Sequence, residues 1–197
     1  MNLAFITEDG TDDVVLSLLL RRLGSPEHTS TRYLAGVGFG AVLKNAPPLV
    51  RQAARGRCRA AILSVDCDET ANHFQVNHQT DDSNCRRCRL SNSLPPLHEL
   101  RKLSAGAFEV VIAVPVRTIE SWLAILAGIQ IPGSLSEFGK TRHERLELKR
   151  LVYGDATPTA EVMRTRAQQI GGAGDLQQLE RASPSFADFR EESRALR

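Results

Sequence analysis

Short apolar runs alternate with amphipathic stretches along the first two thirds of the chain. Four runs are predicted as strands: 3–7, 31–35, 60–65 and 110–114. Runs 60–65 and 110–114 have the length and composition of buried strands. Apolar residues at helical spacing mark the stretches 12–24, 41–55, 95–105 and 119–128, and Pro47-Pro48 is expected to break or restart the second of these helices. Strands that alternate with helices favour a mostly parallel sheet flanked by helices. The predicted fold class is therefore α/β and Rossmann-like.

From residue 131 the pattern changes to short helical segments rich in Arg and Lys. We expect residues 131–197 to form a helical C-terminal appendage, in the same domain as a core of residues 1–130. A chain of 197 residues has the size of one ordinary domain. Near its end, Ser183 predicts a helix cap, and Phe186 and Phe189 are expected to dock the last helix.

The composition and the charge of the chain indicate which class of protein it belongs to. Apolar residues make up 42% and charged residues 24%, which is typical of a soluble globular protein. No apolar run is long enough to cross a bilayer, and the first residues lack a signal peptide, so we expect a cytoplasmic protein without a membrane partner. The net charge of +2 conceals a basic C-terminal third. These basic residues could bind a phosphate-bearing partner, or they could equally well form ordinary solvated helix faces.

Carboxylates follow three of the predicted strands. Glu8 ends the first strand, Asp66 and Asp68 follow the third, and Glu120 follows the fourth. The carboxyl ends of parallel strands meet at one edge of a sheet, so we expect a composite site there. Asp66 and Asp68 are two residues apart in an extended segment, so both can face one divalent cation.

Each of these acids also has a structural interpretation. Asp66 and Asp68 could be a solvated strand end. Asp12, which follows the first strand, could cap the next helix. Glu120 could simply favour the dipole in the first turn of its helix.

A polar insertion at about 69–93 shows no hydrophobic periodicity. It contains His73, His78, Cys85 and Cys88, which have the ligand types of a tetrahedral structural zinc site. A metal would supply folding energy that such a segment lacks. The alternative is a flexible basic insertion whose thiols and imidazoles are incidental.

The order of the acids resembles the TOPRIM family of metal-dependent nucleic-acid enzymes, above all the TOPRIM-like nucleases of the OLD class and the small stand-alone proteins related to them. The family signature is a Glu-Gly-x-x-Asp turn and an Asp-x-Asp motif, and OLD-class members add a further acid and a lysine. The matching residues are Glu8, Asp12, Asp66, Asp68, Glu120 and Lys149. The likeness covers about residues 1–128. The glycine of the turn stands third, in Glu8-Asp9-Gly10, where the family has it second.

The resemblance implies a TOPRIM-like endonuclease of antiphage defence that hydrolyses phosphodiester bonds with Mg²⁺ or Mn²⁺. It implies that Glu8, Asp66 and Asp68 bind metal directly. Asp12 and Glu120 would hold a second ion, and Lys149 would stabilise charge on the phosphate. DNA is expected as substrate in preference to RNA. OLD-class nucleases work with an ATPase, and this chain has no Walker loop, so a separate ATPase subunit is the expected partner.

Two other functions fit parts of the pattern. Asp66-x-Asp68-x-Thr70 also matches the loop of haloacid-dehalogenase-like phosphatases, in which the first aspartate is the nucleophile. Those proteins usually carry the loop on their first strand. In a third interpretation the chain is a non-catalytic subunit whose insertion binds nucleic acid or protein. In every case the zinc site and the acidic site share no ligand, so we expect them to act independently.

Overall fold

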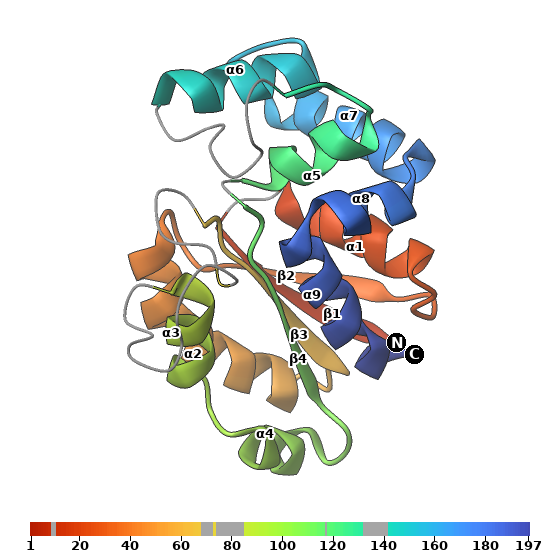
Figure 1. Cartoon of the computed structure of the whole chain (residues 1–197). Helices are drawn as coiled ribbons and strands as arrows, with labels where there is room; N and C mark the ends of the chain where they lie inside the picture. The colour runs from red at the N-terminus through yellow and green to blue at the C-terminus, as the bar shows by residue number, and fades with distance from the viewer. Residues whose placement is uncertain (9–10, 68–72, 74–84, 117, 132–141) are drawn as a thin grey trace.

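The structure, a computed structural model, describes residues 1–8, 11–67, 73, 85–116, 118–131 and 142–197 (Figure 1). Its centre is an all-parallel sheet of four strands in the order β2-β1-β3-β4. The strands are β1 (Asn2–Thr7), β2 (Thr29–Leu34), β3 (Ala60–Ser64) and β4 (Glu109–Ala113). Helices flank this sheet, so the predicted α/β class is confirmed.

The two central strands are apolar on both faces because both faces are covered. Every residue of β3 is buried, as is β1 from Leu3 onwards. The register pairs Ile6 with Leu63 and Leu63 with Ile112, so the carboxyl ends of these strands lie level. Segments that leave β1, β3 and β4 therefore emerge at one edge of the sheet.

One face of the sheet is covered by α2 (Phe39–Arg55), α3 (Arg86–Ser93) and α4 (Leu97–Ser104). Two expectations fail on this face. Helix α2 continues through Pro47 and Pro48, because its apolar side stays buried along the whole length and outweighs the lost helical hydrogen bonds. Part of the polar insertion is helical, since α3 begins at Arg86.

The other face is covered by helices from both ends of the chain, namely α1 (Asp12–Arg22), α5 (Ile119–Leu126), α6 (Arg142–Tyr153), α7 (Ala160–Ala173), α8 (Leu176–Ala182) and α9 (Pro184–Ser193), with a final 3-10 turn, η2 (Arg194–Leu196). Trp122 of α5 is fully buried against Phe186 and Phe189 of α9, with ring centroids 5.3 and 5.6 Å away. The C-terminal helices thus complete one hydrophobic core. Phe186 and Phe189 dock the last helix as expected.

Helix α9 also covers the edge strand β4. The N–H of Ile112 donates to Oε2 of Glu192 at 2.8 Å, which satisfies a backbone group that an open edge would expose. Burial raises the pKa of the Glu192 carboxyl, and the Ile112 hydrogen bond and Arg87 oppose that rise. Among the described helices, none is both long and apolar enough to cross a bilayer.

Candidate functional site

A pocket of about 510 Å³ lies at the carboxyl edge of the sheet. Its lining includes three of the predicted carboxylates and the predicted lysine: Asp12, Asp66, Glu120 and Lys149. The rest comes from α5, α6, α7 and the segment before α7: Thr118, Ile119, Arg145, Leu146, Ala156, Thr157, Pro158 and Met163. We call this site the acidic pocket. It gathers residues that the sequence keeps far apart.

Asp12 lies in the first turn of α1 and is almost fully buried, with 5% of its surface exposed. The N-cap position belongs to Thr11, so Asp12 does not cap the helix through its side chain. Its neighbour Asp13 has a different role, because it pairs with Nη2 of Arg32 at 2.5 Å. Of these two adjacent acids, only Asp12 contributes to the acidic pocket.

Glu120, in the first turn of α5, is also 5% exposed. Two groups from α6 reach Oε1 of this carboxylate: the Tyr153 hydroxyl at 3.3 Å and Nζ of Lys149 at 3.9 Å. These partners offset the cost of burying its charge. The Lys149 side chain remains about one third exposed, at 35%, so its ammonium group can also contact a ligand in the pocket.

Glu8 is placed differently from the other predicted ligands. Its Oε2 accepts from the N–H of Gly38 at 3.0 Å, at the N-terminus of α2. The first turn of α2 contains no acid of its own, so Glu8 supplies negative charge to that helix end. Glu8 is not part of the acidic-pocket lining. Asp68 lies outside the described residues.

Arg145 and Thr118 are among the acidic-pocket residues that the sequence did not predict. Arg145 of α6 belongs to the basic C-terminal third, and nothing in its helical pattern distinguishes it from a solvated arginine. Thr118 was detectable, because it precedes Ile119-Glu120 at the N-cap of α5. Its buried Oγ1 has no hydrogen-bond partner among the described residues, which suits a group that meets a ligand.

A second cluster combines His73, Cys85 and Cys88, whose ligand atoms all lie within 4.8 Å of one another. The imidazole Nδ1 is 3.3 Å from Sγ of Cys85 and 3.5 Å from Sγ of Cys88. Cys85 is the N-cap of α3, so the Cys-x-x-Cys spacing brings both sulfurs to the first turn of that helix. This thiol cluster could hold a metal ion. His78 lies outside the described residues.

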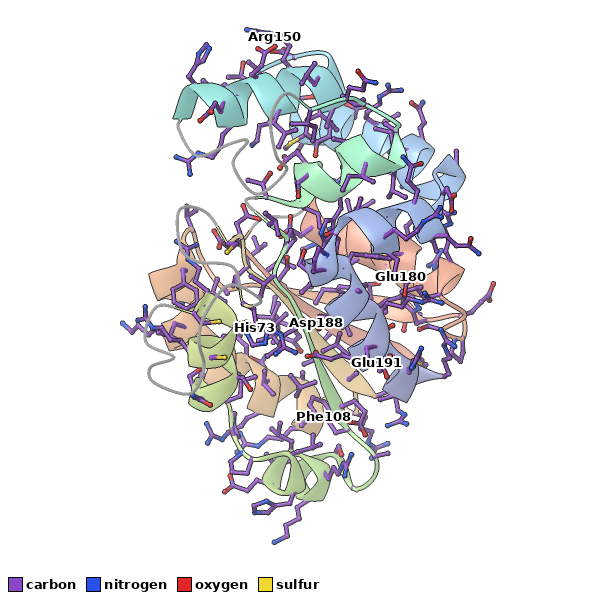
Figure 2. All side chains as sticks on the ribbon, in the orientation of Figure 1. His73, Phe108, Arg150, Glu180, Asp188 and Glu191 are labelled. Atoms are coloured by element: carbon purple, nitrogen blue, oxygen red, sulfur yellow. The ribbon has the colours of Figure 1, made fainter. Side chains whose placement is uncertain are left out.

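Beside the thiol cluster is a cavity of about 10 Å³, which has room for roughly one water-sized sphere. Cys67, His73, Arg87 and Asp188 contribute to its lining, and Figure 2 shows His73 next to Asp188 of α9. Nη1 of Arg87 is 3.3 Å from Nε2 of His73. A metal bound to Nδ1 would require the tautomer with the proton on Nε2, which then needs an acceptor, and Asp188 contributes to the same cavity lining.

Asp66 and Cys67, the second and third residues after β3, belong to different sites. Asp66 contributes to the acidic pocket and Cys67 to the cavity beside the thiol cluster. Consecutive residues of an extended segment point to opposite sides, which explains this division. The two candidate sites are therefore neighbours in the chain.

Comparisons with known proteins give no relative: no protein family, curated protein or solved structure matches this chain. The fold is established as α/β with a parallel sheet. The likeness to TOPRIM enzymes continues to rest on the residues given above.

Proposed function

We propose that this chain is a divalent-metal-dependent nuclease, with the acidic pocket as its active site. The observation that carries the proposal is the meeting of Asp12, Asp66 and Glu120 with two basic residues of α6, Lys149 and Arg145, in one pocket. The acids suit metal binding, and the bases suit a phosphate. The proposed substrate is DNA in preference to RNA, in antiphage defence beside a separate ATPase subunit.

The donor set of the acidic pocket fits Mg²⁺ or Mn²⁺. Carboxylate oxygens are the ligands that these hard cations prefer. When bound, the ions would supply an activated water and polarise the phosphate. Asp12 and Asp66 would hold them, and Glu120 would either join these ligands or hold Lys149.

In this proposal the basic residues of α6 bind the substrate and do not bind metal. Lys149 and Arg145 bind phosphate oxygens and stabilise the charge that grows on them during hydrolysis. Glu120, which accepts a hydrogen bond from Tyr153, pairs with Lys149 and holds it in place. Glu8 supports the site from outside the pocket, by tying the end of β1 to α2.

For the thiol cluster we propose zinc. Two sulfurs and an imidazole nitrogen form the soft, tetrahedral environment that zinc favours, whereas the acidic pocket offers oxygen only. The fourth ligand would be His78, which lies outside the described residues. We assign this zinc a structural role, because the cavity beside it is too small for a substrate.

An Mn²⁺-dependent cleavage screen over single-stranded and double-stranded DNA and RNA tests the proposed nuclease. Asp12→Asn should remove activity, whereas Asp13→Asn, the matched control from the same helical turn, should retain it. Equal activity of both variants would contradict the proposed site. Trapping of a phosphoryl group on Asp66 with a fluoride mimic would instead support the phosphatase alternative. If the chain binds nucleic acid but does not cleave it in the presence of Mn²⁺, the result would support the alternative of a non-catalytic binding subunit.

A further inference from the structure

Helix α3 connects the thiol cluster with the acidic pocket. Its first turn contains Cys88 and follows Cys85, and Arg86 lies between these two cysteines. Nη1 of Arg86 donates to the backbone carbonyl of Asp66 at 2.7 Å. Arg86, which lies between two candidate metal ligands of the thiol cluster, thus holds the main chain of Asp66 in the acidic pocket.

The next residue fixes α3 on its other side. Arg87 forms ion pairs with Asp188 and Glu192 of α9, and Glu192 accepts from the edge of β4. The N–H of Cys67 donates to the carbonyl of Pro115 at 3.1 Å, just beyond β4. The segment after β3 is therefore held by α3 on one side and by the end of β4 on the other.

Helix α3 has little of its own to stabilise it. It is eight residues long, and Leu90 is its single buried residue. Helices of this length are unstable in isolation, so the position of α3 depends on its contacts. A metal bound to Cys85 and Cys88 at its first turn would tie those contacts to the rest of the fold.

We propose that the metal of the thiol cluster fixes α3, and that Arg86 thereby positions Asp66 for metal binding in the acidic pocket. Arg86 is then a positioning residue, and the structural metal is a condition for the catalytic one. This proposed coupling differs from the independence of the two sites that the sequence led us to expect. The proposal rests on the metal binding that the proposed function assigns to the acidic pocket, but not on cleavage.

The chain supplies a matched control for Arg86. The guanidinium groups of Arg86 and Arg89 both lie over the ring of Phe39, at 5.1 and 5.0 Å from its centroid. Both residues belong to α3, and of these two the bond to the Asp66 carbonyl is made by Arg86. Arg86→Gln and Arg89→Gln therefore remove similar ring contacts, and only the first removes the link.

The experiment measures three properties of the full chain: zinc content by elemental analysis, Mn²⁺ affinity by calorimetry, and amide exchange in residues 63–67. We expect Arg86→Gln to retain about one equivalent of zinc, to bind Mn²⁺ about tenfold more weakly and to exchange faster, with Arg89→Gln close to wild type. Arg86→Lys should restore part of the affinity. Cleavage by Arg86→Gln should recover at high Mn²⁺, because a misplaced ligand weakens binding without removing a reacting group.

Zinc removal tests the other end of the link. Chelated wild type and Cys85→Ser/Cys88→Ser should both lose Mn²⁺ affinity and protection in residues 63–67, and zinc should restore both properties to the wild type alone. Unchanged exchange after zinc removal, equal effects of the Arg86 and Arg89 variants, loss of zinc from Arg86→Gln, or wild type that binds no zinc would each overturn the proposal. A chain that shows the coupling but cleaves no nucleic acid would contradict the proposed function alone.

Discussion

The acidic pocket and the thiol cluster are neighbours beyond the end of β3, yet they suit different occupants. The pocket measures about 510 Å³ and combines carboxylates with lysine and arginine, whereas the cavity beside the thiol cluster measures about 10 Å³. The larger site can admit a metal and a phosphate-bearing substrate together. The smaller has room for little more than an ion. Volume and donor type together support our proposal that the larger site is catalytic and the smaller one structural.

The two sites also differ in how the chain builds them. The acidic pocket combines Asp12, Asp66 and Glu120 from three separate helix or strand ends with Lys149 from α6. The thiol cluster draws on one short stretch of sequence after β3. A site assembled by the sheet depends on the whole fold, whereas a local site can stabilise its own surroundings.

The largest effect that separates the two sites is expected from Asp66→Asn. Removing a metal ligand of the acidic pocket should lower cleavage at least about a hundredfold. The zinc content should stay at that of wild type, because Asp66 contributes no ligand to the thiol cluster. Cleavage assays and elemental analysis on the same preparation provide the measurement. Loss of zinc together with activity would mean that the two sites form one.

The metal-free stability of Asp66→Asn gives an internal control. Removing one of several neighbouring carboxylates relieves repulsion when no cation is present, so thermal unfolding should occur at or above the wild-type temperature. A strongly destabilised variant would show that Asp66 is needed for folding, and its lost activity would then say nothing about metal binding.

A smaller effect, about ten- to hundredfold on kcat/KM, is expected from Lys149→Met. Lys149 stabilises the phosphate in our proposal and binds no metal, so Mn²⁺ affinity should be unchanged or higher. The measurement pairs steady-state cleavage with calorimetry. A fall in Mn²⁺ affinity would instead show that the Lys149–Glu120 pair keeps the metal ligands in place.

Glu120→Gln, combined with Lys149→Met, sharpens that result. If Glu120 only holds Lys149, the double variant should cleave as slowly as Lys149→Met alone, because the two residues act as one unit. If Glu120 binds metal, the double variant should be slower, and Mn²⁺ affinity should fall. The comparison decides between the two roles that the structure allows for this buried carboxylate.

The acidic pocket was easier to predict from the sequence than its internal contacts. Asp66 and Glu120 could be placed at one edge because strand order and parallel pairing bring strand ends together whatever the loops do. The pairing of Lys149 with Glu120 was not predicted, since it depends on how α6 packs, and no periodicity encodes that. Arg145 was missed for the same reason.

For the thiol cluster, the ligands were easier to predict from the sequence than the surrounding structure. Its ligand types were evident, because Cys-x-x-Cys is a local pattern. Helix α3 was missed because Leu90 is its single buried residue, so it has no apolar stripe to detect. The link from Arg86 to Asp66 could not be foreseen, because an arginine bound to a backbone carbonyl leaves no signature in sequence.

The smallest expected effect concerns His28, whose acid response must be separated from that of the thiol cluster. His28 is buried, with its ring nitrogens 2.9 Å from Oγ of Ser17 and 3.2 Å from the carbonyl of Pro26. Burial lowers its pKa below the ordinary value of 6.5, the Pro26 bond opposes this, and Arg21 and the amino terminus lower it further. A lowered pKa means that the unfolded chain takes up a proton first as pH falls. The contribution of His28 to stability is therefore complete above about pH 6.5 and declines below it, until the folded-state pKa is passed.

His28→Gln removes this titration and keeps a polar side chain at the site. Between pH 8 and pH 5 the unfolding temperature of wild type should fall by more than that of the variant. Differential scanning calorimetry on zinc-loaded and on Cys85→Ser/Cys88→Ser backgrounds provides the measurement. Because His28 shares no contact with the thiol cluster, the difference should be the same on both backgrounds. If the His28→Gln variant is still sensitive to acid and loses that sensitivity when the two cysteines are replaced, the remaining sensitivity is due to the metal. If the effect of His28 depends on zinc, the influence of the thiol cluster extends to α1.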